Sequence, residues 1–150
     1  MNIQKSIENN SRTWHLWVIG ILFLFIYSIG AYDFYMVQIS DINYLNSVNT
    51  NIHALGYFTD YPFAYQILWV INIIGGLAAS LLLLFRSKYV VYVSLIGAIS
   101  LVTLDTLTFA FRNRWDVFGS LTSIIDLIVL IVTIGFFFYS KKIVKQNIIK

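Results

Sequence analysis

The chain contains no cysteine and a single proline, and only 11% of its 150 residues are charged. The lack of cysteine excludes disulfides, thiolate metal sites and thiol redox chemistry, and with them the four-helix thiol oxidases linked to quinones. No Gly-x-Ser-x-Gly motif, glycine-rich phosphate loop or glycosidase-like carboxylate pair is present. The histidines, His15 and His53, lack metal-ligand spacing. We therefore expect no enzyme activity, no catalytic residues, no cofactor and no metal.

Apolar residues fill most of the chain. They make up 59% of it, and the mean hydropathy is +0.76, above the usual range of water-soluble proteins. A helix needs about 20 mostly apolar residues to cross a bilayer. Four stretches reach that length, at about 14–35, 62–85, 89–111 and 116–139. The sequence thus predicts one integral membrane domain over residues 1–150, with an all-α fold that is an antiparallel four-helix transmembrane bundle.

Basic residues predict how this bundle is oriented. Eight of them flank the predicted spans on the side that carries both termini, namely Lys5, Arg12, Arg86, Lys88, Lys141, Lys142, Lys145 and Lys150. Two basic residues, Arg112 and Arg114, fall on the opposite side. Because Lys and Arg are in excess on the cytoplasmic side of membrane proteins, we expect both termini to be cytoplasmic. The lysines suit anionic lipid headgroups, and we expect no nucleic-acid partner.

The connection between the first two spans, about residues 36–61, is the longest segment predicted to lie outside the bilayer. Its apolar residues recur at spacings of three and four, at Ile42, Leu45, Val48, Ile52 and Leu55. That period indicates a short amphipathic helix, with Ser40 or Asp41 as its N-cap. We expect a helical cap on the outer side, acting either as an interfacial anchor or as a moving lid.

Polar and small residues share one face on three of the predicted spans. Asn72 lies on the same face of the second span as Tyr65, Trp69, Gly75, Gly76 and Ala79. Asp105 and Asp126 are placed similarly on the third and fourth spans, and Asp33 lies near the outer end of the first. Small residues mark close helix packing, which we expect at Gly75, Gly76 and Ala79. We expect a one-sided pocket for a ligand or proton, built by Asp33, Asn72, Asp105, Asp126, Arg112, Tyr65 and Trp69.

The depth of these groups follows from a rise of about 1.5 Å per residue. Counted from Pro62 and Asp116, Asn72 and Asp126 lie about 15 Å inside, close to the middle of the bilayer. Intramembrane carboxylates are candidates for function, but each also has a structural interpretation. Asp105 can pair with Arg112 reaching inward. A protonated Asp126 can hydrogen-bond to Asn72 or Thr122, so both interpretations remain open.

A resemblance adds to these observations. The residues that carry it are Gly30-Ala31-Tyr32-Asp33-Phe34-Tyr35-Met36, Asn43-Tyr44-Leu45, Tyr57-Phe58, Pro62, Gly75-Gly76 and the leucine run 81–84. This pattern resembles an uncharacterised family of small four-helix bacterial inner-membrane proteins, often labelled sugar transporters without a demonstrated mechanism. The resemblance covers the first two spans and the loop between them. It implies a bacterial cytoplasmic membrane and a role for Asp33, and it supplies no substrate.

Two classes of function follow from the sequence. In the first, the outward-facing pocket binds a small polar solute, a cation or a proton and helps to transport it, with homo-oligomers expected because four helices are few for alternating access. In the second, the protein is a structural or accessory subunit that packs against a larger membrane partner. The first class predicts unpaired carboxylates in a hydrated pocket. The second predicts that each carboxylate has Arg112, Arg114 or a hydroxyl group as its partner.

Overall fold

The computed structural model describes residues 14–48, 56–58 and 60–149, and over these ranges it contains helices and no strands. The long helices are α2 (Trp14–Gln38), α5 (Phe63–Leu84), α6 (Val90–Phe111) and α7 (Arg114–Lys145), and a short helix, α3 (Ile42–Val48), follows α2. All four long helices have the length and apolar composition required to cross a membrane. This confirms the four predicted apolar helices, with ends that differ by a few residues from those expected.

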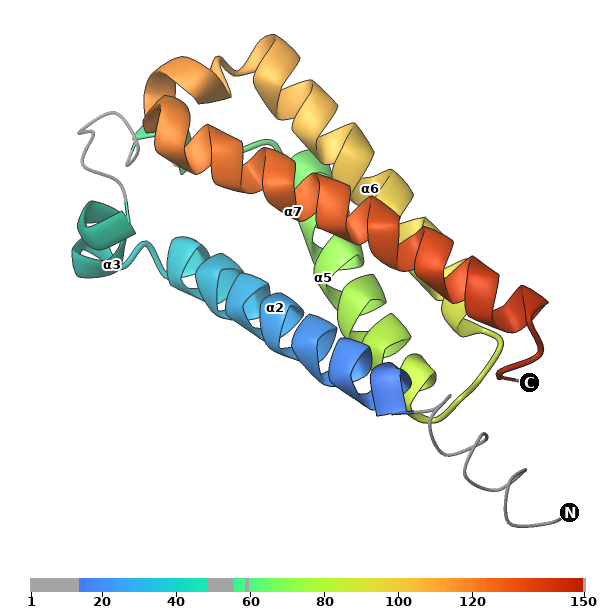
Figure 1. Cartoon of the computed structure of the whole chain (residues 1–150). Helices are drawn as coiled ribbons and strands as arrows, with labels where there is room; N and C mark the ends of the chain where they lie inside the picture. The colour runs from blue at the N-terminus through green and yellow to red at the C-terminus, as the bar shows by residue number, and fades with distance from the viewer. Residues whose placement is uncertain (1–13, 49–55, 59, 150) are drawn as a thin grey trace, which may run out of the picture.

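The helices pack in chain order, α2 on α5, α5 on α6 and α6 on α7 (Figure 1). The beginning of α2, the end of α5, the beginning of α6 and the end of α7 lie together at one end of the molecule. We call this the lysine end, because Lys141, Lys142 and Lys145 are there. The opposite end, which we call the loop end, carries α3, the start of α5 and the connection between α6 and α7.

Short turns join the later helices. Pro62, whose φ of −59° suits a helix start, directly precedes α5. After α5 the backbone turns at Arg86, where φ is +57°, and the Ser87 N–H donates to the carbonyl of Leu82. Asn113, with φ of +48°, forms the turn between α6 and α7, and asparagine tolerates this left-handed conformation better than most residues. The connections are therefore too short to separate neighbouring helices.

Adjacent glycines on α5 bring two other helices close to it. A Cβ added at Gly75 would lie 3.3 Å from the Cα of Gly97 on α6, so the two backbones nearly touch there. The next residue, Gly76, lies against the ring of Tyr27 on α2, which an added Cβ would overlap. Ala79, one turn further, is fully buried. The small residues predicted for packing thus contact α6 on one side and α2 on the other.

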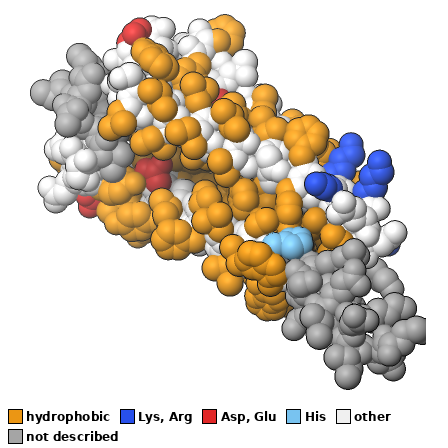
Figure 2. Space-filling view, viewed as in Figure 1, with side chains coloured by type: hydrophobic (Ala, Val, Ile, Leu, Met, Phe, Trp, Pro, Cys, Tyr) orange, Lys and Arg blue, Asp and Glu red, His pale blue; other side chains and the backbone are white. Residues whose placement is uncertain are grey.

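Buried apolar side chains form two clusters along the bundle. The larger cluster lies toward the lysine end and includes Leu16, Phe23, Tyr27, Leu83 and Phe136. The smaller cluster, at the loop end, consists of Tyr57, Tyr61 and Leu104. Much of the remaining apolar surface is exposed. In the most apolar 18-residue stretch of α7 only 17% of the residues are buried, as expected of a helix that faces lipid. Figure 2 shows this apolar surface, with basic side chains grouped at the lysine end.

Helix α7 is not continuous. At Gly119 the backbone has φ of +76° and ψ of 176°, a combination that is essentially restricted to glycine. Residues 114–118 therefore form a separate helical turn that folds back over the rest of α7, as Figure 1 shows in orange. The sequence predicted an uninterrupted span from Asp116. Depths counted from Asp116 are too large, because Asp126 lies only seven residues, or about 10 Å, beyond the break.

Candidate functional site

A cavity of about 520 Å³ lies inside the loop-end half of the bundle. All four long helices contribute to its wall, together with α3 and the loop before α5. Its polar lining consists mainly of Asp33, Asn72, Asp105, Asp126, Arg114 and Tyr44, and its aromatic lining includes Phe58, Tyr61, Trp69 and Phe118. The volume is in the range that small organic ligands occupy in proteins.

Asp126 and Arg114 form an ion pair in the cavity wall. The Arg114 Nε lies 2.7 Å from the Asp126 Oδ2, and both side chains are mostly buried, with 17% and 22% exposed. Twelve residues of continuous helix would separate these groups by about 18 Å. The break at Gly119 returns Arg114 toward Asp126, so the ion pair depends on the backbone conformation of a single glycine. The Arg114 guanidinium also lies 4.9 Å above the ring of Phe118.

Asp33 extends into the cavity from α2. Its Oδ1 accepts a hydrogen bond of 2.8 Å from the hydroxyl of Tyr44 on α3. Burial of the Tyr44 hydroxyl, followed by its contact with Asp33, raises the pKa of this phenol, which therefore keeps its proton at neutral pH. Helix α3 is itself held by Asp41, whose side chain accepts a hydrogen bond of 2.7 Å from the Tyr44 N–H. Asp41 thus caps α3 and helps to position the partner of Asp33. Ile52 and Leu55, which the sequence predicts to belong to the same amphipathic cap, lie outside the described residues.

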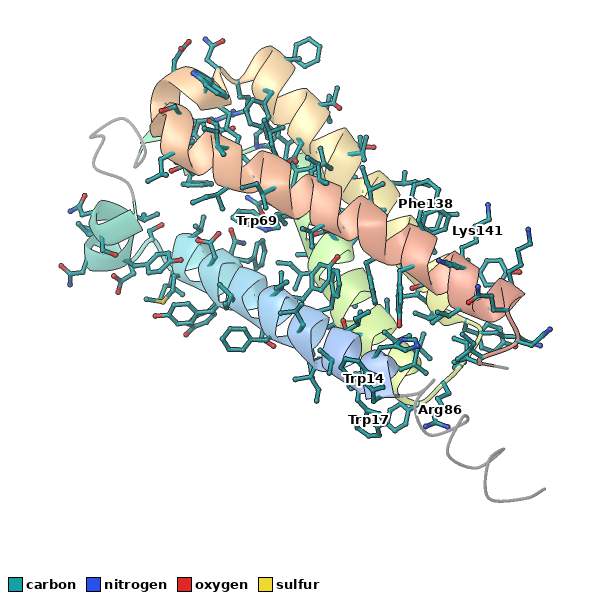
Figure 3. All side chains as sticks on the ribbon, in the orientation of Figure 1. Trp14, Trp17, Trp69, Arg86, Phe138 and Lys141 are labelled. Carbon is teal, nitrogen blue, oxygen red and sulfur yellow. The ribbon has the colours of Figure 1, made fainter. Side chains whose placement is uncertain are left out.

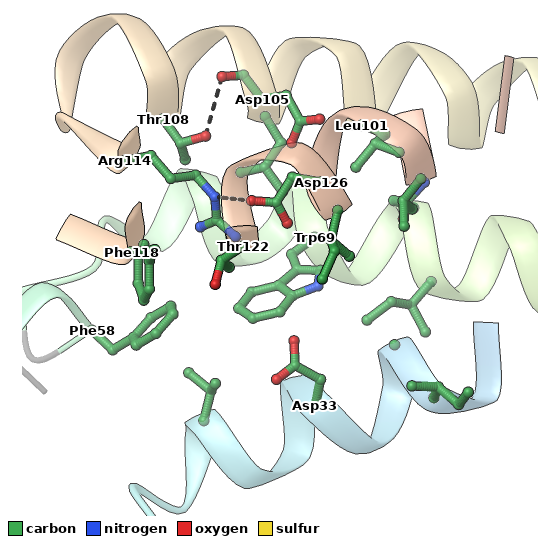
Figure 4. Close-up of a pocket in the computed structure, with 18 of the residues that line it drawn as sticks. Asp33, Phe58, Trp69, Leu101, Asp105, Thr108, Arg114, Phe118, Thr122 and Asp126 are labelled. Atoms are coloured by element: carbon green, nitrogen blue, oxygen red, sulfur yellow. Dashed lines mark hydrogen bonds and ion pairs between the residues drawn. The ribbon is translucent and has the colours of Figure 1, made fainter. Parts of the chain in front are cut away.

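Asp105 differs from the other two acidic residues. It is only 9% exposed, it lines the cavity, and its Oδ2 has no hydrogen-bond partner among the described residues. Figure 4 shows its side chain directed toward Asp126 and Arg114, with Thr108 bonded to the Asp105 backbone carbonyl. A buried oxygen without a partner costs free energy. Its presence in the cavity wall marks a position where a positively charged ligand group would be favoured.

Arg112 does not pair with Asp105 and does not line the cavity. Its guanidinium donates to the backbone carbonyls of Tyr57, at 2.6 Å, and Asp60, at 3.0 Å. It also lies 4.6 Å above the Tyr57 ring. The side chain is thus held by backbone carbonyls of the loop before α5 and not by the Asp105 carboxylate. Arg112 therefore stabilises the loop, and Arg114 is the cation of the cavity.

The three other residues predicted for the pocket differ in their positions and contacts. Trp69 lines the cavity and lies between Asp33 and Asp126 in Figure 4. Tyr65, one turn earlier, packs edge-on against Tyr61 and is outside the cavity lining. Asn72 reaches the wall, but its amide donates to the carbonyl of Gly97 at 3.1 Å. It joins α5 to α6 and makes no hydrogen bond to Asp126 among the described residues.

Comparison with protein-family models, curated proteins and solved structures finds no match for this chain. The resemblance to small inner-membrane proteins therefore stays a prediction. Among the described residues, no three His, Asp or Glu side chains are grouped closely enough to hold a metal ion. The site is a cavity with acidic and aromatic residues, and its chemistry has to be argued from those residues alone.

Proposed function

We propose that this chain is a multi-pass membrane protein that binds a small organic cation in the loop-end cavity and takes part in its transport. In this proposal the four helices form an antiparallel bundle in a bacterial cytoplasmic membrane. Both termini are cytoplasmic, the loop end faces outward, and α3 acts as a cap on the outer side. The charges and contacts of the two ends support this arrangement.

The contacts of the basic residues in the structure support this orientation more strongly than a count of basic residues along the sequence does. At the lysine end Arg86 is exposed beside Trp14 and Trp17, and Lys141 is exposed near the end of α7, as Figure 3 shows. Tryptophan is enriched at membrane interfaces, and exposed basic residues favour the cytoplasmic side. The two arginines at the loop end have internal partners, since Arg112 binds loop carbonyls and Arg114 binds Asp126. They therefore carry less weight against an outward-facing loop end.

The observation that carries the proposal is the charge of the cavity. Asp33, Asp105 and Asp126 line it, and Arg114 is its only Lys or Arg among the described lining residues. Since Arg114 is paired with Asp126, the remaining acidic groups are Asp33, bonded to a neutral phenol, and Asp105, with a free oxygen. A cation placed near Asp105 would offset this excess in a region where water is scarce.

The aromatic lining favours an organic cation over a metal ion. Ammonium groups are attracted to the faces of Trp, Tyr and Phe rings, and quaternary ammonium ligands are commonly bound by such rings. Trp69 and Phe58 lie in the same cavity as the three carboxylates, with ring centroids 6.2 Å apart. A cavity of about 520 Å³ also provides far more room than a bare metal ion needs.

A second function remains supported by specific contacts. The pairs Arg114–Asp126 and Tyr44–Asp33 are what a structural or accessory subunit would have, because polar pairs inside a membrane hold helices together. In that case the protein would act as a scaffold for a larger membrane partner or for further copies of itself. Asp105 distinguishes the two functions, since a purely structural carboxylate would be expected to have a partner.

The test is cation binding by the full chain in lipid nanodiscs, with tetramethylammonium as the probe and tryptophan fluorescence as the readout. We expect Asp105→Asn to weaken binding about tenfold to hundredfold, or by about 1.4–2.8 kcal/mol, because the quaternary ammonium loses its ionic attraction to a carboxylate in a site of low dielectric constant. Asp116→Asn is the matched control, since Asp116 is exposed and outside the cavity lining. Equal binding by the two variants, or no binding by the native chain, would favour the structural subunit. Uptake of the same probe into proteoliposomes then tests transport.

A further inference from the structure

Helices α2 and α7 are joined over only part of their length. Among the described residues, three hydrogen bonds or ring contacts connect them, and none lies beyond Tyr27 on α2. His15 lies 2.6 Å from the Tyr139 hydroxyl, Phe23 stacks on Phe136 with centroids 4.1 Å apart, and Tyr27 donates to Thr133 at 3.1 Å. Beyond Tyr27, no hydrogen bond or ring contact joins α2 to α7 among the described residues. Among the described residues, the two helices thus lack such contacts beside the cavity.

The cavity opens through this gap. Three apolar residues that line it are also exposed on the outside of the bundle, namely Ile29 on α2 and Leu121 and Ile125 on α7, with 54%, 74% and 51% exposed. A side chain that both lines a cavity and is exposed stands at its mouth. Figure 2 shows a hollow on this face, with an acidic side chain beside it and apolar side chains around it.

The position of the mouth determines what surrounds it. Ile29, Leu121 and Ile125 belong to the helices that are long and apolar enough to cross a membrane. Gly30, beside Ile29, lies eight residues before the end of α2, or about 12 Å along the helix. With the loop end outward, the opening faces the acyl chains of the outer leaflet. A ligand that enters there comes from lipid, and its charged group meets Asp105 inside.

We infer that the ligand of this cavity is an amphipathic organic cation that enters sideways from the outer leaflet between α2 and α7. Its ammonium group would lie among Asp105, Asp33 and Trp69, and its apolar chain would leave between Ile29 and Ile125. This inference rests on the proposed cation site and specifies the class of its ligand. A water-soluble cation without a chain would bind more weakly, because the apolar mouth adds nothing to its affinity.

Gly30 provides a direct way to close the mouth. It lines the cavity, and a Cβ added to it would meet no atom within 4 Å. Gly30→Leu therefore places a side chain at the opening, with free space around its Cβ. Gly135 on α7 is the matched control, because its added Cβ also meets nothing within 4 Å and it is not a lining residue. Gly135→Leu makes the same chemical change on a surface away from the cavity.

The experiment compares two probes with the same headgroup, octyltrimethylammonium and tetramethylammonium, by calorimetry in zwitterionic lipid nanodiscs. Nanodiscs without protein correct for partitioning into lipid. We expect the octyl probe to bind about a hundredfold more tightly, because burying three or four methylene groups is sufficient for that factor. Gly30→Leu should weaken octyl binding at least about tenfold and change tetramethylammonium binding by less than about threefold. Gly135→Leu should change neither, and octanesulfonate should not compete.

The outcomes separate the two proposals. If both probes bind equally in the native chain and Gly30→Leu affects neither, the sideways opening is overturned and the cation site stands. If neither probe binds the native chain, the cation site itself is overturned. If Gly30→Leu changes the number of chains per particle instead of octyl binding, a second copy covers the gap and the inference is overturned. Thermal unfolding of both variants shows whether a loss of binding reflects a loss of folding.

Discussion

The two halves of this bundle are built differently. At the lysine end, the side chains of α2, α5 and α7 pack closely, and Leu16, Ala79 and Leu83 are almost completely buried. At the loop end, the same helices surround a cavity, and among the described residues no hydrogen bond or ring contact joins α2 to α7 beyond Tyr27. The chain thus places its dense packing and its polar cavity at opposite ends of the same four helices.

This difference shows how a small membrane protein can hold buried charge. Helices in lipid associate through packing and polar contacts, because lipid tails are as apolar as the side chains themselves. The half at the lysine end, which we call the closed half, provides that packing and fixes the spacing of the helices. The half at the loop end, which we call the open half, can then keep acidic groups that would otherwise weaken the bundle. If this comparison is correct, variants of the two halves will lose stability for different reasons.

The largest effect is expected from the ion pair of the open half. Arg114→Gln leaves Asp126 as a buried carboxylate without its cation and should lower the free energy of unfolding by about 3 kcal/mol. Unfolding by SDS titration in mixed micelles measures this change. The double variant Arg114→Gln with Asp126→Asn should recover most of the loss, because no charge is left alone. A double variant as unstable as the single one would mean that Arg114 acts through packing on Phe118 instead.

A smaller effect is expected in the closed half from Gly76→Ala. The added methyl group overlaps the Tyr27 ring, so α2 must move away from α5, and we expect a loss of about 2 kcal/mol in the same assay. Gly135→Ala is the control. Its methyl group meets no atom, and alanine is the better helix former by up to about 1 kcal/mol, so this variant should be unchanged or slightly more stable. Equal effects at the two glycines would contradict the close packing of α2 on α5.

The sequence was sufficient to predict four long apolar helices, because that signal depends only on length and composition. It also placed Asp33, Asp105, Asp126 and Trp69 on faces that the structure brings to one cavity. These positions follow from helical periodicity, which is regular along an unbroken helix. The prediction failed where the periodicity is interrupted.

Gly119 is that interruption, and it decides which arginine reaches the cavity. Gly119 lies seven residues before Asp126, which is the same face of a continuous helix, and an isolated glycine in a helical pattern can serve packing as well as mark a break. Without the break, Arg114 lies too far from Asp126, and Arg112 is the natural candidate partner for Asp105. The turns at Asn113 and Gly119 instead bring Arg114 to Asp126, while Arg112 binds the carbonyls of the loop before α5. Partners that depend on one unusual backbone conformation cannot be read from residue spacing.

The smallest expected effect is a gain in stability at Asp105. Since its buried Oδ2 has no hydrogen-bond partner within the described part of the chain, Asp105→Leu should raise the free energy of unfolding by about 1 kcal/mol while abolishing tetramethylammonium binding. Asp105→Asn keeps the shape and a polar group, so it should gain less than leucine and also weaken binding. Both values come from the same SDS titration and fluorescence assays. If Asp105→Leu instead lowers stability, the carboxylate contributes to helix packing, and the open half would then hold its acidic groups for structure rather than for a ligand.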